Sequence, residues 1–592
     1  MCKGDDSQAK DAHLGSPERC ECPRASHPTV PRTVSRHRYY DMRNIYDFIV
    51  IGAGSAGCAL TARLAQDGRT VALVEAGPDD HWIWLKIPAG VGMILRQHRA
   101  VWRFFTAPEA QLNERQVYWP RGKVLGGTSS INGMIWSRGE RQEYEHWHAL
   151  GNTAWGADEV MECFRRIEAY GHGEPSVRGT SGPVHITRFS PRLALSEAFH
   201  RACQEAGIPS TSDYNGRQYE GVGYLQFNTR RGLRHGGKEA YLAKVRRNSN
   251  LDVLTDTTVL KIMLDGKRAT GVEVERDGKR MRLNAAREVI LCAGAIQSPQ
   301  LLELSGIGDA TRLQEMGIEV VQNLPGVGEN CRDHLHSRIM YECTRPITMN
   351  DILVSPWRKF AMGLRYMVKR DGLMSCSTAT VHALARSTPA LQRPDVRIQL
   401  HHLSSESPRD PTRLVVDPFP GFSIGTFMLR PTSMGSVHIQ AKDPHEPPRM
   451  TANYLAEELD RATCIAALRL ARRIAEQPSL RRYIVRETRP GIEVMSDDEL
   501  LAYMRETGTT SYHPMGTCKM GTDTKAVVDS QLRVRGIDGL RVADASVMPT
   551  MSSPNTNAVA MMIGERCADM VLGAHTTRQG LASERLLAEA ES

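Results

Sequence analysis

The sequence predicts an α/β fold class in which a nucleotide-binding sheet is assembled from segments that lie far apart in the chain. A strand–turn–helix–strand unit occupies residues 46–75, and β-rich runs follow at 251–275 and 281–292. A further short strand at 539–544 ends in an acidic residue. Residues 335–505 mix strands such as 395–400 with a helix at 457–476, so we expect a second domain of mixed sheet and helices inserted between these segments.

The unit at 46–75 has the pattern of a Rossmann-type βαβ unit. The run 46–51 is apolar apart from Asp47, as in a parallel strand buried on both faces, and 70–75 is a second such strand. Helical spacing over 58–66 connects the two strands. The unit therefore predicts a crossover helix between two parallel strands of one sheet.

The turn between the first strand and the helix carries the pattern G-x-G-x-x-G at Gly52, Gly54 and Gly57. Gly52 permits a tight turn, Gly54 lets a pyrophosphate approach the backbone, and Gly57 allows close packing of helix on strand. Free N–H groups at the helix N-terminus favour an anion there. The agreement of strand, turn and helix predicts dinucleotide binding.

Glu75 closes the second strand, 23 residues beyond Gly52. Its carboxylate suits a ribose 2′-hydroxyl and would repel a 2′-phosphate. This pattern alone does not distinguish NAD from FAD.

Composition excludes several classes of function. The chain has 592 residues, and its net charge of +8 is a mild excess that does not indicate nucleic-acid binding. No run of about 18 apolar residues is present, so we expect no membrane span. The 13 cysteines lack the paired spacing of a zinc site, so we expect no metal centre and reduced thiols.

Polar ends flank the predicted domains. Residues 1–44 have no apolar period and no signal-peptide core, so we expect a disordered extension there, and we expect a tail with one short helical stretch at 574–592. The nucleotide-binding domain is predicted to comprise 45–145, 235–334 and 508–573, and the inserted substrate-binding domain 146–234 and 335–507.

Several motifs resemble those of the glucose–methanol–choline (GMC) family of flavoprotein oxidoreductases. They are Pro120–Ile135 (PRGKVLGGTSSINGMI), Gly294–Gly308 (GAIQSPQLLELSGIG), Tyr512–Gly521 (YHPMGTCKMG), Val528–Val534, Leu540–Pro549 and Ser553–Asn557. Together with the Gly52 turn they follow the family's order from about residue 45 to 573.

The resemblance implies FAD rather than NAD. The expected cofactor contacts are Gly52, Gly54, Ser55, Gly57, Glu75, Gly126, Gly127, Thr128, Ser129, Asn132, Gly133, Met134, Ile135, Val259, Ala293, Gly294, Asp544, Ala545 and Asn557. Some family members attach FAD covalently through a histidine just before the loop asparagine. Ile131 stands at that position and cannot form the bond, so we expect non-covalent FAD.

The resemblance also implies oxidation of an alcohol to an aldehyde or ketone, with hydride transfer to flavin N5. Histidine suits removal of the hydroxyl proton near neutral pH, and the family's histidine corresponds to His513. The second family position, a histidine or asparagine, corresponds to Asn555. Other histidines are expected to be structural, namely His98, His148, His235, His334, His336, His401 and His402.

The substrate is expected to be a small-molecule alcohol. The segment 375–387 carries no acidic residue that could pair with a quaternary ammonium, which argues against choline as the substrate. The Met-rich region 354–374 suits a hydrophobic alcohol or is helix core. Seven of the eight tryptophans fall within 82–155, where aromatic packing beside the flavin loop is favoured over an aromatic cage.

Other interpretations stay open or are set aside. Cyanohydrin cleavage by a lyase with the same base is the main alternative, whereas a purely structural flavoprotein would not need His513. The P-loop-like spacing at 232–238 is rejected because Glu239 stands where a magnesium-binding hydroxyl belongs, and Cys518 is expected to pack. We expect a cytoplasmic protein, peripheral to a membrane through a quinone-type acceptor or else using oxygen. Oligomeric state stays open.

Overall fold

The computed structural model describes residues 43–97, 99–189, 192–377, 379–406, 415–553 and 555–573. The chain divides into two units, residues 1–43 and residues 44–592, and only the second unit is described below. The predicted extension at 1–44 lies outside the described residues apart from its last two, and the predicted tail at 574–592 lies wholly outside them.

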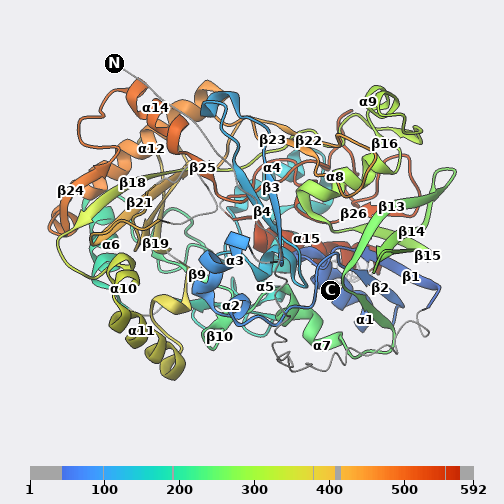
Figure 1. Cartoon of the computed structure of the whole chain (residues 1–592), viewed down its shortest axis with the longest axis horizontal. Coiled ribbons are helices and arrows are strands. Elements are labelled where there is room, and N and C mark those ends of the chain that lie inside the picture. Colours follow the sequence, from blue (N-terminus) through green and yellow to red (C-terminus); the bar gives the residue numbers. More distant parts are fainter. Residues whose placement is uncertain are drawn as a thin grey trace, which may run out of the picture. The chain divides into compact units, whose positions relative to one another are not determined.

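The first sheet, formed by seven strands of the described chain, has the order β12-β2-β1-β15-β14-β13 with β26 beside β15 (Figure 1). Its strands are β1 (Ile45–Ile51), β2 (Val71–Val74), β12 (Leu251–Leu254), β13 (Thr257–Asp265), β14 (Arg268–Arg276), β15 (Lys279–Leu291) and β26 (Leu540–Val542). Strands β12, β2, β1, β15 and β26 pair in parallel, and β13–β15 form an antiparallel meander. The predicted α/β fold and its assembly from distant segments are confirmed.

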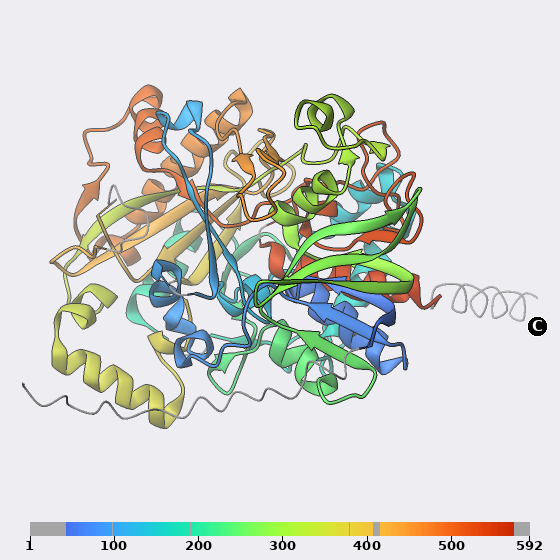
Figure 2. The same ribbon diagram turned by 45° about the vertical axis from the view of Figure 1, so that its right-hand side comes forward.

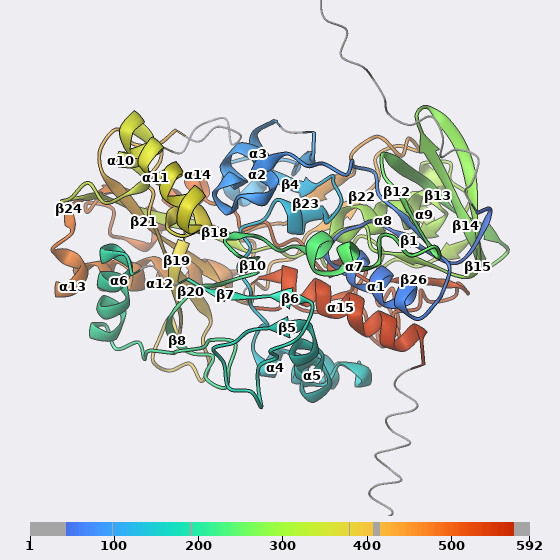
Figure 3. The ribbon, with the colours of Figure 1, turned by 90° about the horizontal axis from the view of Figure 1, so that it is seen from below.

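Helix α1 (Ser55–Gln66) connects β1 to β2 and packs against α15 (Thr556–Val571), as Figure 3 shows from below. The two helices approach closely because Gly564 faces the backbone of Ala56, where a Cβ would lie 2.3 Å from the carbonyl oxygen. This contact holds α15 against α1, and Asn555 is the N-cap residue of α15. The nucleotide-binding sheet thereby positions the expected catalytic asparagine.

The second sheet is antiparallel, with the order β24-β18-β21-β20-β19-β8 and β25 beside β18 among the described residues. Its strands are β8 (Gly221–Tyr224), β18 (Leu335–Cys343), β19 (Ala379–Ala385), β20 (Val396–His401), β21 (Gly421–Met428), β24 (Ile484–Arg489) and β25 (Thr509–Thr510). Helices α6 (Ala194–Glu205) and α12 (Glu458–Glu476) pack on this sheet around an apolar core (Figure 2). Its division from the first sheet as a separate substrate-binding domain stays a proposal.

Shorter elements complete the described chain. The remaining helices are α2 (Ile83–Lys86), α3 (Val91–Gln97), α4 (Arg141–Ala149), α5 (Ala157–Ile167), α7 (Ala243–Val245), α8 (Gly294–Leu304), α9 (Ala310–Glu315), α10 (Met349–Val354), α11 (Pro356–Lys369), α13 (Pro478–Arg481) and α14 (Asp497–Thr507). The two-stranded ribbons are β3 (Val101–Phe105) with β4 (Tyr118–Gly122), β5 (Glu168–Ala169) with β6 (Val184–His185), β7 (Thr187–Arg188) with β9 (Gln226–Phe227), β10 (Thr229–Arg230) with β11 (Leu233–Arg234), β16 (Ile307–Gly308) with β17 (Gln322–Asn323), and β22 (Ser436–His438) with β23 (Arg449–Thr451). No helix formed by the described residues has the length and apolar character needed to span a bilayer.

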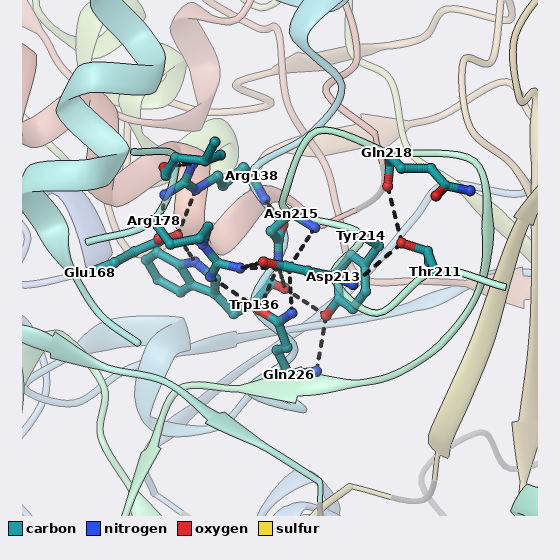
Figure 4. Close-up of polar contacts among 11 residues, drawn as sticks. Trp136, Arg138, Glu168, Arg178, Thr211, Asp213, Tyr214, Asn215, Gln218 and Gln226 are labelled. Atoms are coloured by element: carbon teal, nitrogen blue, oxygen red, sulfur yellow. Dashed lines mark hydrogen bonds and ion pairs between the residues drawn. The ribbon is translucent and has the colours of Figure 1, made fainter. Parts of the chain in front are cut away.

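A buried ionic network anchors the segment that follows the glycine-rich loop (Figure 4). Glu168 accepts hydrogen bonds from Arg138 Nε at 2.7 Å and Arg178 Nε at 2.8 Å, and Arg178 also contacts Asp213 at 2.6 Å. Asn215 Oδ1 accepts from the backbone N–H of Arg138 at 2.8 Å. Burial raises the pKa of Glu168, but the two guanidiniums outweigh burial and hold that pKa below its usual value. The carboxylate is therefore ionised between two buried cations.

Glu168→Gln is expected to destabilise the fold by about 3–5 kcal/mol, because it leaves both guanidiniums without their shared counter-charge. The measurement is the shift of the denaturant unfolding midpoint. Glu174→Gln is the matched control, since Glu174 pairs with Arg217 on the surface and its loss is expected to leave the midpoint unchanged. Equal midpoints for the two variants would contradict the role assigned to Glu168.

Candidate active site

A cavity of about 1000 Å³ extends from the Gly52 turn to the second sheet. Its nucleotide end is lined by Gly52, Gly54 and Glu75, and its other end by side chains of β18, β20 and β21. Both the Gly52 turn and the loop Gly127–Ile135 border it. The cavity therefore joins the two regions that the sequence assigns to cofactor and substrate.

The first glycine turn has the geometry expected for a pyrophosphate cradle. Gly52 has φ +95°, and a Cβ there would lie 2.6 Å from Cys292 O; a Cβ on Gly57 would lie 2.0 Å from Gly52 O. At Gly54 the nearest atom to a Cβ would be 3.9 Å away, so the backbone faces open space. No side chain caps α1, which leaves its first N–H groups available to an anion.

The second glycine turn packs directly on the first. A Cβ on Gly127 would lie 2.6 Å from Gly54 Cα, which explains why position 127 needs glycine. Thr128 lines the cavity. Ser129 does not, because its hydroxyl donates to Gly126 O at 2.6 Å and accepts from Gly237 N at 2.8 Å. Ser129 and Gly126 thus hold the turn rather than face a ligand.

Buried polar atoms around the nucleotide end fit an FAD. The Nδ2 atom of Asn557 is buried without a hydrogen-bond partner, while its Oδ1 accepts from Ser55 Oγ at 2.7 Å. Glu75 accepts from the N–H groups of Ala53 and Gly77 at 2.9 Å each, and burial raises the pKa of Glu75 to about 7. The carboxylate can accept a hydrogen bond from a ribose hydroxyl, and the unpaired amide can donate one to a flavin ring.

A chain of hydrogen bonds connects the second sheet to the expected base. His334 Nε2 lies 2.9 Å from Leu429 O, and His334 Nδ1 lies 2.9 Å from His513 Nδ1. At the far side, Asn555 Nδ2 lies 2.9 Å from His513 Nε2, and Arg397 Nη1 donates to Asn555 Oδ1 at 2.6 Å.

These contacts fix both tautomers. A carbonyl oxygen only accepts, so His334 Nε2 carries the proton and His334 Nδ1 is a lone pair. His513 Nδ1 therefore donates to it, which leaves His513 Nε2 unprotonated and accepting from the Asn555 amide. Burial lowers the pKa of His513 well below its usual value, and His334, Arg397 and Arg121 lower it further. At neutral pH the site thus presents a neutral imidazole with its lone pair beside the cavity.

Asp333 holds the backbone of this pair in place. Its Oδ1 accepts from the backbone N–H of His513 at 2.7 Å, and its Oδ2 accepts from the hydroxyls of Tyr454 and Thr510. The residue before the base, Tyr512, has φ +66°, a left-handed conformation that costs a non-glycine residue about 1–2 kcal/mol. The buried carboxylate therefore stabilises a strained approach to His513.

Comparison with known proteins decides the family. Profiles described as GMC oxidoreductase match residues 46–336 and 431–564. The chain is 39% identical to the oxygen-dependent choline dehydrogenase of Photobacterium profundum, over 90% of this chain and 94% of that one.

The chain belongs to the GMC oxidoreductase family.

Further relatives agree with this assignment. The mitochondrial choline dehydrogenase of Homo sapiens is 38% identical over 90% of this chain and 91% of that one. The crystal structure of pyridoxine 4-oxidase from Mesorbium loti has a TM-score of 0.80 at 29% identity, covering 88% of this chain and 98% of that one. This GMC oxidoreductase is accordingly an FAD-dependent enzyme that acts on CH–OH donors.

Most of the expected site residues border the cavity of this GMC oxidoreductase. Those that line it are His513, Asn555, Gly52, Gly54, Ser55, Glu75, Gly127, Thr128, Asn132, Gly133, Met134, Ile135, Val259, Ala293, Gly294, Asp544, Ala545 and Asn557. Gly57, Gly126 and Ser129 lie outside the lining and serve the packing of the two turns. Asp544 has a structural use as well, since it accepts from Gly294 N at 2.8 Å.

Sequence reasoning missed His334, which it assigned to structure alone, and it missed Asp333, Arg338 and Arg397 altogether. A signal was present: polar residues alternate with apolar ones at 397, 399 and 401, and they also stand at 334, 336 and 338, where Ser337 interrupts the alternation. Such alternation in a buried strand places polar side chains on one face. In this enzyme that face borders the cavity.

Other expectations have mixed outcomes. Four of the clustered tryptophans are packing residues whose indole N–H groups find partners, namely Trp119, Trp136, Trp147 and Trp155. Trp84 and Trp102 line the cavity. The ten cysteines within the described ranges are buried and free, Cys518 among them. Lys238 of the rejected P-loop pattern pairs with Asp79 at 2.5 Å.

The interpretation of 354–374 as helix core is wrong. Helix α11 lies at the periphery of the unit (Figure 2). Of its side chains only Tyr366 is buried. A few residues of this region, including Met362 and Met374, do line the cavity.

Acid is expected to destabilise this enzyme steeply. Burial lowers the pKa of His235, His334 and His402 to about 4 each. Because these values lie below that of an unfolded histidine, about 6.5, the unfolded state binds protons first as pH falls. Stability is therefore full above pH 6.5 and falls toward pH 4, by about 1.4 kcal/mol per pH unit for each histidine.

The check is the denaturant unfolding midpoint measured from pH 7.5 to 4.5. His402→Gln is expected to reduce the slope, because it removes one of the protons taken up on unfolding. A midpoint that does not change over this range would contradict the burial of neutral histidines.

Proposed function

We propose that this enzyme oxidises an alcohol to an aldehyde or ketone, with His513 as the base and Asn555 as its partner. The observation that carries the proposal is the hydrogen-bonded chain from Leu429 to Arg397, which supports an unprotonated Nε2 on His513 beside the cavity. An alcohol hydroxyl that replaces the Asn555–His513 contact can donate to Nε2 while its oxygen accepts from Asn555 Nδ2.

In this arrangement each proton has a specific donor atom and a specific acceptor atom. The hydroxyl proton passes to His513 Nε2, and the resulting imidazolium keeps donating through Nδ1 to His334. Asn555 Nδ2 stabilises the oxygen as negative charge develops on it, and Arg397 polarises that amide through its hydrogen bond to Oδ1. When bound, FAD would supply the hydride acceptor for the carbon, and oxygen or a quinone-type compound would be the final electron acceptor.

We also propose that FAD is held without a covalent bond. Ile131, the position of a linking histidine in some relatives, is a buried aliphatic side chain on the cavity wall and has no atom that forms such a bond. The two glycine turns, the uncapped start of α1 and the orphaned amide of Asn557 are the groups that would hold the pyrophosphate and the ring system.

His513→Ala is expected to keep bound FAD and to lower the rate of flavin reduction by an alcohol 10²–10⁴-fold, because the hydroxyl proton then has no acceptor. The measurement is anaerobic bleaching of the yellow enzyme, with flavin content determined after acid precipitation; flavin left on the precipitate would contradict non-covalent binding. His445→Ala, at an exposed histidine, is the control.

The same experiment distinguishes the alternatives. Wild-type flavin that no alcohol bleaches would overturn oxidation, and cyanide release from a cyanohydrin without bleaching would favour a lyase. Near wild-type reduction in His513→Ala would remove His513 from the mechanism. Comparing reoxidation by air and by a soluble quinone then identifies the class of acceptor.

A further inference from the structure

One face of the second sheet forms the floor of the cavity at its substrate end. Side chains of alternate residues project from the same face, which groups His336 and Arg338 of β18 with Arg397 and Gln399 of β20. The strand between them, β21, contributes Gly425, which pairs with both Arg338 and Gln399. A Cβ on Gly425 would lie 2.2 Å from His336 Nε2, so the glycine gives these longer side chains room.

Two arginines on this floor lack a counter-charge. Arg397 is 0% exposed, and its Nε and Nη2 atoms have no hydrogen-bond partner. Arg338 Nε is also buried and unpaired, and the described groups that act on the charge of either arginine are tyrosines rather than carboxylates. Burial lowers the pKa of Arg397 to about 10 and lowers the pKa of Arg338, yet Arg397 stays protonated at neutral pH. A buried guanidinium left uncompensated favours an anionic ligand.

Acidic groups in the cavity lining are confined to the nucleotide end. Among the described residues that line the cavity, the carboxylates are Glu75 and Asp544, both beside the glycine turns. Asp333 lies behind His513, outside the lining, with its oxygens already accepting from protein donors. At the substrate end Arg121 adds a third guanidinium. The guanidiniums at this end disfavour a cationic substrate.

We propose that the alcohol oxidised by this enzyme carries a carboxylate, which Arg397 and Arg338 bind while the hydroxyl lies at His513. The proposal rests on the proposed alcohol oxidation and names its substrate class as short hydroxycarboxylates. One amide group, that of Asn555, separates the Arg397 guanidinium from His513 Nε2, so the carboxylate lies only a few bonds from the hydroxyl carbon. The C–H and O–H bonds of the alcohol break and a C=O bond forms; the hydride goes to FAD and the proton to His513.

The test is anaerobic flavin reduction of the holoenzyme by matched pairs of substrates. Each pair consists of a 2- or 3-hydroxycarboxylate and its methyl ester, and choline is included as the cation. The carboxylates are expected to reduce the flavin at least tenfold more efficiently than their esters, and choline least. Arg397→Met and Arg338→Met are each expected to abolish this preference, with Arg386→Met, at an exposed arginine, as control.

Binding to the unmodified enzyme is a second measurement that needs no variant. Propanoate is expected to perturb the flavin spectrum and compete with substrate, and propanamide is not. Esters or choline that reduce the flavin as well as the carboxylates do would overturn the substrate class alone. Failure of every alcohol to reduce the flavin would instead overturn the proposed function.

A separate observation concerns helix α11, which turns apolar side chains to solvent. Trp357 is 80% exposed, and Phe360, Leu364, Met367 and Val368 are exposed as well. At 100° per residue these side chains share the side opposite Tyr366, which is buried and donates to Gly232 O at 2.7 Å. The apolar stripe therefore faces away from the body of the enzyme.

Positive charge flanks this stripe. Residues 356–371 carry five basic side chains and one acidic one, Asp371, which pairs with Arg365 at 2.7 Å. A helix with exposed Trp, Phe and Leu beside Lys and Arg has the composition of one that lies in the interface of a bilayer. We propose that α11 binds the surface of a membrane containing anionic lipids. Met362 and Gly363 of α11 also line the cavity, so docking brings one of its walls to the lipid surface.

The test is co-sedimentation with vesicles of phosphatidylcholine, with and without phosphatidylglycerol. The holoenzyme is expected to bind the anionic vesicles at least tenfold more strongly, and the double variant Trp357→Ser, Phe360→Ser is expected to lose that binding while turnover with a soluble acceptor is unchanged. Ile492→Ser is the control, because Ile492 is an exposed apolar residue outside α11. Equal binding by the double variant, or a dimer that dissociates in it, would overturn the proposal.

Discussion

The hydrogen bond between the Nδ1 atoms of His334 and His513 is the constraint on which the site depends. Two ring nitrogens at 2.9 Å need one proton between them, and the carbonyl of Leu429 at the far side of His334 decides which ring carries it. His334 immediately precedes β18 and Leu429 immediately follows β21. Pairing of these two strands therefore determines the tautomer of His513. Without it, the neutral imidazole could carry its proton on either ring nitrogen.

Charge is compensated differently in two buried parts of the molecule. In the network of Figure 4, Glu168 lies between Arg138 and Arg178. Its negative charge compensates the two guanidinium charges, which would otherwise be costly to bury. At the substrate end of the cavity no carboxylate meets Arg397, and the same cation helps to lower the pKa of His513. Arg138 and Arg178 thus have a counter-charge within the fold, whereas no carboxylate among the described residues compensates Arg397. A base that stays neutral in such surroundings can accept a proton at physiological pH.

Local patterns allowed much of the fold to be predicted. The Gly52 turn depends on contacts within one βαβ unit, and the strands and α12 follow from apolar runs and helical spacing. His334 and Arg397 could not be placed because each acquires its role through strand pairing with distant segments. Ser129 shows the opposite case: its motif suggested a cofactor contact, yet its hydroxyl donates to Gly126 O within its own turn. The periodicity of a sequence indicates which side chains lie on the same face of a strand or helix. It does not indicate which distant segment or cavity that face contacts.

In this enzyme, the residues of the family motifs and the residues proposed to select the substrate lie on different sheets. The glycine turns, Glu75 and Asp544 belong to the first sheet and its connections, whereas Arg338 and Arg397 belong to the second. A side chain on β20 can change without moving the turns that would hold the cofactor, because the two sets meet only across the cavity. Likeness to choline dehydrogenases over nine-tenths of the chain therefore fixes the flavin chemistry but leaves the charge of the substrate to be decided by a few residues. In this chain those residues are cationic, and a quaternary ammonium finds no carboxylate among them.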